Sequence, residues 1–172
     1  MRAGEIVDGL KAIGWFEGRS PGAAGELLEH LKEVEADGYP GELLYRQIAD
    51  VTYLTDGAED EDSYEQLIQE FATASRGRFA PASVASEEDE GGEGLQKVTF
   101  TLAGRQYAIP YDPESKYIET DIAQIINTAL ATAGVTERFY YLPTVDEEIA
   151  LVFVRPEVHA AGVTRGLIPL TK

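Results

Sequence analysis

Cysteine is absent from the 172 residues of this chain. A chain without cysteine forms no disulfide, and it has no thiolate to bind a metal or attack a substrate. The lack of disulfides suits a reducing compartment. The first twenty residues, MRAGEIVDGLKAIGWFEGRS, contain no long apolar run of the kind found in a secretion signal. We therefore expect a cytoplasmic protein.

Basic residues are also few: the chain has 14 lysines and arginines but 31 aspartates and glutamates. The formal net charge is −17 and the isoelectric point is near 4.4. Such a chain repels nucleic-acid phosphates and anionic membrane surfaces. No window approaches the roughly 18 apolar residues that a membrane span needs. We expect no nucleic-acid or membrane partner and an attraction for a basic protein, with solubility alone as the alternative role of the charge.

Histidine occurs only twice, as His30 and His159. The two are not spaced as metal ligands on one element, so the common zinc patterns are excluded and we expect no metal and no cofactor. His30 lies between Glu26 and Glu33 at helical spacing, which favours a surface ion pair. His159 lies in a short turn near the carboxyl end, where we expect it to be solvated.

The string Gly18-Arg19-Ser20-Pro21-Gly22 matches the G-x-S-x-G pattern of a hydrolase nucleophile elbow. That elbow needs a backbone N–H directly after the serine, and Pro21 has none. Too few residues precede Ser20 to form the strands that support an elbow. The sequence instead predicts that Ser20 caps a helix and that Pro21 occupies its first position. We expect no catalytic residue and no enzyme activity, although a hydrolase using two of the many carboxylates remains an alternative.

Residues 1–84 have the apolar spacing of helices. We expect helices over residues 3–16, 23–38 and 41–54, and a fourth that begins at Asp62 or Ser63 and includes Phe71. Residues 85–96 follow, with the stretch ASEEDEGGEG, which offers almost no apolar side chain to bury. We predict an acidic, glycine-rich linker or loop there.

Residues 97–172 change to the alternating pattern of strands. Residues 97–102 and 106–111 predict a hairpin with its turn at residues 103–105, and Pro110 predicts that its second strand lies at a sheet edge or that pairing ends there. A helix is expected to end at Gly134. Strands follow at 138–143 and 150–154, the latter apolar on both faces and therefore central, and a short helical turn begins at Pro156. The expected fold is α+β: N-terminal helices, then a small, mainly antiparallel sheet in the order β-β-α-β-β with one helix packed across it. One compact domain formed by both regions is the alternative.

Three acidic stretches are candidates for the surface that contacts a partner. Aromatic side chains rimmed by charge of one sign suit a protein interface that forms by electrostatic attraction. The third stretch adjoins a tyrosine pair of this kind. The candidate partner-binding residues are Glu59, Asp60, Glu61 and Asp62; Glu87, Glu88, Asp89 and Glu90; and Asp146, Glu147 and Glu148 beside Tyr140 and Tyr141.

The segments VTFTLAGRQYAIPYD, FYYLPT and ALVFV, in a small acidic chain without cysteine, resemble the immunity proteins encoded beside bacterial polymorphic toxins. The resemblance covers roughly residues 97–160 and lies in the pattern of the segments. It implies a non-catalytic inhibitor that neutralises a basic toxin domain by covering its active site. A structural or adaptor domain with another partner is the alternative.

Overall fold

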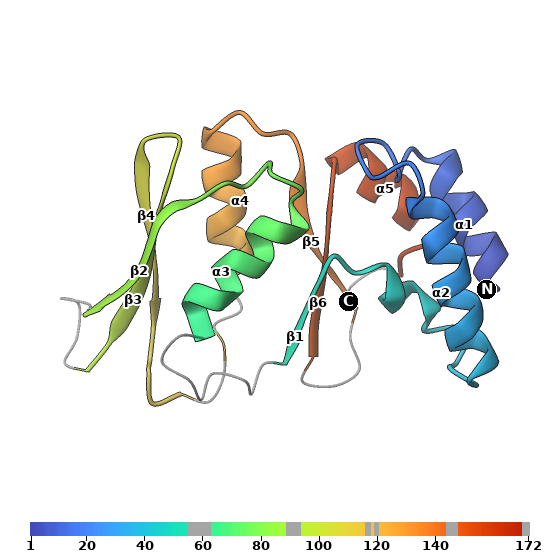
Figure 1. The fold of residues 1–172 in the computed structure, drawn as a ribbon, viewed down its shortest axis with the longest axis horizontal. Helices are drawn as coiled ribbons and strands as arrows, with labels where there is room; N and C mark the ends of the chain where they lie inside the picture. Colours follow the sequence, from blue (N-terminus) through green and yellow to red (C-terminus); the bar gives the residue numbers. More distant parts are fainter. Residues whose placement is uncertain (55–62, 89–93, 116–117, 119–120, 144–147, 170–172) are drawn as a thin grey trace.

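The structure, a computed structural model, describes residues 1–54, 63–88, 94–115, 118, 121–143 and 148–169. Its described elements form an α+β fold of four layers: a sheet, two helices, a second sheet and an outer layer of helices (Figure 1). The elements are α1 Ala3–Ala12, α2 Ala23–Ala36, the 3-10 helix η1 Leu44–Ile48, β1 Val51–Leu54, α3 Ser63–Ala74, β2 Ala82–Glu88, β3 Gln96–Leu102, β4 Arg105–Tyr111, α4 Ile122–Thr132, β5 Arg138–Leu142, β6 Glu148–Val154 and α5 Pro156–Thr164.

The described strands are divided between two antiparallel sheets, with the orders β1-β6-β5 and β2-β3-β4. The α+β class, the N-terminal helices and the antiparallel pairing are confirmed. The expectation of a single sheet holding all four predicted strands is wrong. Helices α3 and α4 lie between the sheets (Figure 1), so α4 packs against β4 on one side and β5 on the other.

Strand β6 is the central strand of its sheet, as its uniformly apolar sequence predicts. Alternate side chains of a strand point to opposite faces. Ile149, Leu151 and Phe153 therefore enter the core shared with α3, α4 and the other sheet. Ala150, Val152 and Val154 enter a second core beneath α1, α2 and α5. Both faces of β6 are covered, which explains why no position from 149 to 154 is polar.

The first core lies between the two sheets and is rich in aromatic rings. Phe71 of α3 contacts Phe139 edge-on, with ring centroids 4.7 Å apart. Phe79 meets Phe100 of β3 in the same way at 5.4 Å. Edge-to-face contacts of this kind stabilise beyond the burial of the rings. They fix the helices against both sheets and so fix the surfaces that flank α4.

The N-terminal helices form the second core, and α1 and α2 confirm the helical spacing of residues 3–12 and 23–36. Gly38 follows α2 with φ +87°, a left-handed conformation that glycine adopts without strain. The expected helix over 41–54 is wrong except for the short 3-10 helix η1 over Leu44–Ile48, because Val51–Leu54 is strand β1. Val51, Thr52 and Tyr53 are β-branched or aromatic, and pairing with β6 overrides their helical spacing.

Part of the predicted linker is also a strand. Residues 85–88 belong to β2, where Ser86 lies opposite Val98 and Glu87 opposite Lys97 of β3. The backbone N–H of Ser86, on the other side, donates to the carboxylate of Glu65 at 2.7 Å. Backbone hydrogen bonds, which leave no trace in an apolar pattern, hold this exposed strand. Residues 89–93 of the predicted linker lie outside the described residues.

The predicted hairpin of β3 and β4 is confirmed, with Gly104 at φ +76° in its turn. Pro110 lies on β4, which is an edge strand as predicted. The predicted cap at Ser20 is wrong, since α2 begins at Ala23 after Gly22. Ser20 is exposed, and its carbonyl accepts the N–H of Ala23 at 3.0 Å. It lies in a turn between two helices, so no strand leads into it.

Candidate functional site

Only some residues of the predicted acidic stretches are among those that the structure describes. Glu59, Asp60, Glu61, Asp62, Asp89, Glu90, Asp146 and Glu147 lie outside the described residues. Glu87 and Glu88 are exposed at the end of β2, and Glu87 accepts a hydrogen bond from Thr99 at 3.3 Å. Glu148 forms an ion pair with the guanidinium of Arg46, whose side chain is largely buried. Arg46 of η1 thus connects the outer layer to β6 through Glu148, and the role of Glu148 in contacting a partner stays a prediction.

Tyr140 and Tyr141 lie on the edge strand β5 and differ in exposure. Tyr140 is half-buried and stacks on His159 of α5, with ring centroids 4.0 Å apart and planes at 7°. Tyr141 is 36% exposed, and few other large apolar side chains of the described residues are as exposed. Burial raises the pKa of both phenols. The pair is thus divided into a stacked, supporting ring and an exposed ring that can contact a partner.

Both tyrosines line one groove, which we call the Tyr141 groove. It has a volume of about 590 Å³ and lies between the outer side of α4, the edge of β5 and His159. Its walls are mostly apolar, with a few polar groups that can orient a ligand. The lining residues are Ala123, Gln124, Asn127, Thr128, Ala131, Thr132, Phe139, Tyr140, Tyr141 and His159.

Asn127 of α4 fixes the spacing of the groove walls. Its side-chain amide donates to the carbonyl of Phe139 at 2.8 Å and accepts the N–H of the same residue at 2.8 Å. These are backbone groups that a neighbouring strand would otherwise pair with, so Asn127 closes the edge of β5 at that position. The groove therefore has fixed walls and favours side-chain contacts over the addition of another strand there.

His159 differs from the expectation of a solvated loop residue, because it lies on α5 and stacks on Tyr140. Burial lowers the pKa of its imidazole below the usual value of 6.5. A histidine with a lowered pKa favours folding in its neutral form. Its contribution to stability is present above the unfolded pKa and is lost as the pH falls toward the lower folded pKa.

We expect the free energy of unfolding of the wild-type chain to decrease more than that of a His159→Phe variant between pH 7 and pH 5. Phenylalanine keeps a ring against Tyr140 but takes up no proton. Urea denaturation at several pH values measures the difference, and the subtraction removes the titration of groups common to both proteins. Parallel pH profiles would show that His159 does not titrate differently in the folded state.

A second hollow, the Leu95 hollow, lies on the other side of α4. It has a volume of about 320 Å³ and is lined by Leu95, Ile109, Pro110, Tyr111, Asp112, Asp121 and Ile125. Leu95 is 36% exposed. Tyr111 is held in place, since it stacks on Tyr64 at 4.0 Å and its hydroxyl donates to Gln96 at 2.7 Å. The hollow thus combines an apolar floor with two carboxylates, a combination that suits a side chain with an apolar stem and a cationic end.

Asp121 connects the two hollows. It lines the Leu95 hollow, and its charge, after burial, is the next largest cause that raises the pKa of Tyr141 in the neighbouring groove. Asp121 immediately precedes α4, so the start of this helix presents an acid between two apolar depressions. We call the Tyr141 groove and the Leu95 hollow together the α4 surface.

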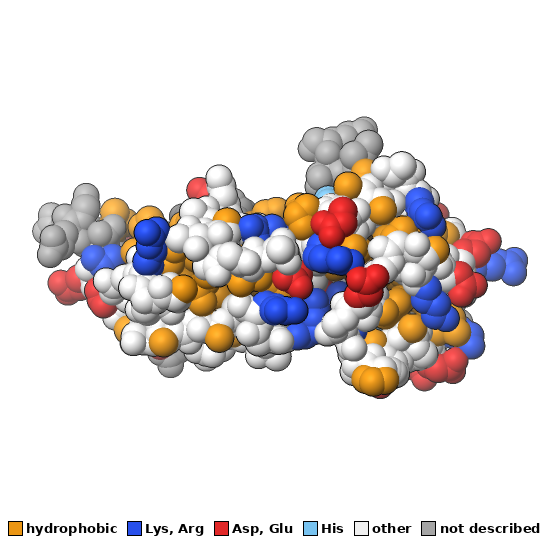
Figure 2. Space-filling view, turned by 90° about the horizontal axis from the view of Figure 1, so that it is seen from above, with side chains coloured by type: hydrophobic (Ala, Val, Ile, Leu, Met, Phe, Trp, Pro, Cys, Tyr) orange, Lys and Arg blue, Asp and Glu red, His pale blue; other side chains and the backbone are white. Residues whose placement is uncertain are grey.

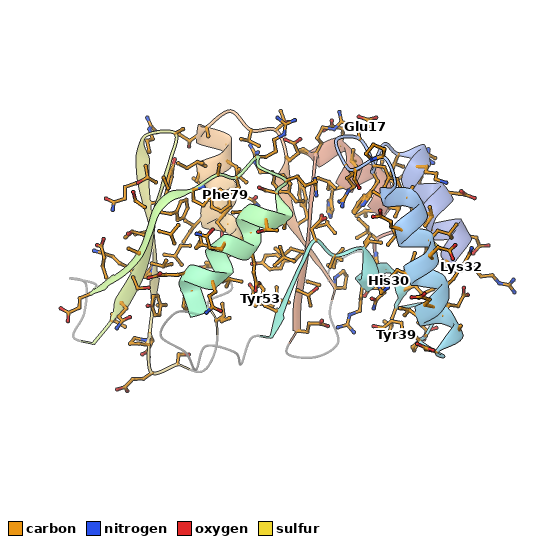
Figure 3. All side chains as sticks on the ribbon, viewed as in Figure 1. Glu17, His30, Lys32, Tyr39, Tyr53 and Phe79 are labelled. Atoms are coloured by element: carbon orange, nitrogen blue, oxygen red, sulfur yellow. The ribbon has the colours of Figure 1, made fainter. Side chains whose placement is uncertain are left out.

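Tyrosines also underlie the α4 surface from within. Burial raises the pKa of Tyr53 of β1, and the phenols of Tyr141 and Tyr64 add to this effect. The hydroxyl of Tyr53 is buried and has no hydrogen-bond partner among the described residues. Tyr53 lies in the lower half of the molecule as drawn in Figure 3.

Arginines gather at the opposite, upper end, which Figure 2 shows from above as Lys and Arg side chains close to Asp and Glu side chains. Arg76, Arg78 and Arg155 line a small cavity of about 60 Å³ together with Glu17 and Glu137. We call it the arginine hollow. The sequence contains no signal for it beyond the closeness of Arg76 and Arg78, because the fold brings Arg155 and Glu17 from distant positions.

Asp50 forms a network beside the arginine hollow. Its carboxylate accepts two hydrogen bonds from Arg19, at 2.7 and 2.9 Å, and one from Arg76 at 3.2 Å. It also accepts the backbone N–H of Phe153 at 2.8 Å, while Arg76 donates to the carbonyl of Phe153 at 2.7 Å. The network joins the α1–α2 connection, the end of α3 and the end of β6.

His30 has a different partner from the one expected, because its Nε2 lies 3.1 Å from the amide oxygen of Gln47 in η1.

Within the described ranges, the histidines, aspartates and glutamates form no group of three or more that could hold a metal ion. The helices of the same ranges include none that is both long and apolar enough to cross a bilayer. Comparison with family models, with curated proteins and with solved structures finds no match to this chain.

Proposed function

We propose that this chain is a non-catalytic, cytoplasmic protein-binding protein, an inhibitor of the immunity type, and that its α4 surface receives a basic protein partner. The observation that carries the proposal is the juxtaposition of two apolar hollows with Asp121 between them, on a chain of net charge −17. A toxin domain with a cationic active site has the complementary chemistry.

The exposed apolar residues supply the binding energy in this proposal. Tyr141 and Leu95 are each 36% exposed and lie at the Tyr141 groove and the Leu95 hollow. Interfaces derive most of their affinity from a few buried side chains, and tyrosine is enriched among them. The rigid support of Tyr140 and Asn127 keeps the entropy cost of ordering this surface small.

The acids supply attraction and orientation. Asp112 and Asp121 border the Leu95 hollow, and Glu157 is close enough to Tyr140 to raise the pKa of its phenol. Asp112 is held by accepting the backbone N–H of Glu114 at 2.9 Å. Complementary charge raises the association rate and makes it fall as salt increases. An acidic rim around apolar depressions therefore selects a basic partner over a neutral one.

The test begins with capture of the partner by the full chain at low and at high salt, followed by binding measurements with the purified pair. We expect Tyr141→Ala to raise the dissociation constant by roughly 30-fold, the effect of losing one dominant contact. We expect Asp121→Asn to lower the association rate about threefold. Surface plasmon resonance or stopped-flow fluorescence measures both constants.

Glu33→Gln is the matched control for Asp121→Asn, because Glu33 is an exposed acid on α2 and its removal changes the net charge equally. An equal loss of association rate in both variants would assign the attraction to overall charge and not to the α4 surface. A captured partner that is acidic, or whose binding does not depend on salt, would contradict the proposal. Turnover of a small molecule at this surface would also contradict it.

A further inference from the structure

We infer that the arginine hollow binds an oxyanion group, a carboxylate or a phosphate, in competition with the side chain of Glu17. This site lies at the upper end of the molecule, where Figure 3 labels Glu17, and it shares no lining residue with the α4 surface. The inference therefore stands independently of the proposed partner.

The hollow concentrates positive charge on an otherwise acidic chain. Three of the 14 basic residues, Arg76, Arg78 and Arg155, line a cavity that contains two carboxylates, those of Glu17 and Glu137. The net charge of the lining is thus positive, although the chain carries −17. Because the Debye length is about 8 Å at physiological ionic strength, acids on the far parts of the chain have little effect on an anion bound in the hollow, and the acids that pair with the arginines from outside the lining are Asp50 and Glu157.

Two of the arginines have guanidinium N–H groups to offer. The only ion pair of Arg78 within the described residues is a long one, from Nε to Glu137 at 3.7 Å, and its side chain is 64% exposed. Arg155 uses Nη2 for Glu17 at 2.6 Å and Nε for Glu157 at 3.4 Å. Among the described residues the Nη groups of Arg78 and Nη1 of Arg155 have no hydrogen-bond acceptor. Planar guanidinium groups bind carboxylate and phosphate oxygens in pairs, which suits one oxyanion held between them.

Arg76 supplies a fixed positive charge at the base of the hollow. Its donors are used by Asp50 and by the carbonyl groups of Ala74 and Phe153, so its position is determined by the fold. Burial lowers the pKa of its guanidinium, and the neighbouring Asp50 only partly offsets this effect. A further negative charge nearby would stabilise the cation.

Glu17 already shows the chemistry that the hollow accepts. Its carboxylate forms a 2.6 Å ion pair with Arg155, yet its side chain is 67% exposed. It lies on a turn between Gly14 and Gly18, both at positive φ, +79° and +76°. An exposed ion pair contributes little to stability. An external oxyanion can therefore replace Glu17 without disturbing the core.

The size of the hollow restricts the ligand. A volume of about 60 Å³ accepts one phosphate or carboxylate group with little additional chain. The rest of a larger molecule would extend into solvent past Arg78 and Glu17. The structure therefore assigns recognition of an anionic group and not of a complete metabolite.

The test is a titration of the full chain with inorganic phosphate and, separately, with acetate, at an ionic strength kept constant with sodium chloride. NMR of the arginine Nε–H groups follows Arg78 and Arg155 directly. We expect saturable shifts of both groups, and the stronger of the two titrations distinguishes a phosphate site from a carboxylate site. Arg78→Gln should weaken binding roughly tenfold, the equivalent of one lost charge-assisted hydrogen bond.

Glu17→Gln should strengthen binding at least threefold, because it removes the competing carboxylate. Glu33→Gln removes the same charge far from the hollow and should leave the affinity unchanged. Equal strengthening by both variants would assign the effect to net charge and overturn the inference. NMR shifts that increase linearly with anion concentration, and that chloride reproduces, would also overturn the inference. The arginines would then serve only to connect the layers of the fold. Thermal melting of each variant verifies that it is folded.

Discussion

Asp50→Ala lowers the free energy of unfolding by about 3 to 5 kcal/mol, the range for removing one member of a buried ion pair. The side chain of Asp50 is only 9% exposed, and those of Arg19 and Arg76 are 15% and 30% exposed. Without the carboxylate, two partly buried cations lose their counter-charge and the N–H of Phe153 loses its acceptor. Urea denaturation followed by circular dichroism measures the loss.

Asp50→Asn is the informative companion variant, because asparagine keeps an acceptor for Phe153 but removes the charge. We expect it to lose less stability than Asp50→Ala. Glu29→Ala is the control, since Glu29 pairs with Lys32 on the exposed side of α2 and should cost less than about 1 kcal/mol. A loss at Asp50 as small as that at Glu29 would show that the arginines are solvated without their partner.

Phe71→Ala is expected to have an effect of similar size, about 3 to 5 kcal/mol. The ring is fully buried between the sheets and meets Phe139 at 4.7 Å. Truncation leaves a cavity at the centre of the first core that neither sheet can fill without moving away from α3 and α4. Thermal and urea unfolding measure the change.

Phe71→Leu keeps most of the volume and should cost clearly less than Phe71→Ala. Phe16→Ala is the matched control, because Phe16 is only half-buried at the margin of the second core. We expect it to cost less than half as much as Phe71→Ala. Equal losses at the two positions would mean that the second core is as tightly packed at its margin as the first is at its centre.

The sequence pattern predicts those elements whose burial repeats along the chain. Strands β3 to β5 and the helices α1 to α4 carry such a repeat, whereas β6 is recognised by its uniformly apolar sequence and the edge position of β4 by Pro110. Strand β2 does not, because its backbone pairs with β3 while its side chains stay largely exposed. The separation of the strands into two sheets was also beyond the pattern, since the apolar pattern of a strand shows which of its side chains are buried and not which strand it pairs with.

The residues of the candidate site also divide into those that the sequence predicts and those that it does not. Tyr141 was predicted because an aromatic pair beside acids is visible in the sequence. The role of Glu148 was not, because its partner Arg46 is about a hundred positions away in the chain. Asn127 gave no signal either, since its importance lies in two bonds to the edge of β5. Arg155 and Glu17 meet only because β6 ends beside the α1–α2 connection.

The place of β6 in the sheet has a consequence for biosynthesis. The helices of residues 1–50 bury their apolar sides against a wall formed by Ala150, Val152 and Val154 of β6. Asp50 likewise accepts a hydrogen bond from the backbone N–H of Phe153, 103 residues later in the chain. A ribosome synthesises that wall about a hundred residues after the helices that it covers. The amino-terminal helices therefore leave the exit tunnel with their apolar sides uncovered, and they acquire their native packing only after β6 has also emerged.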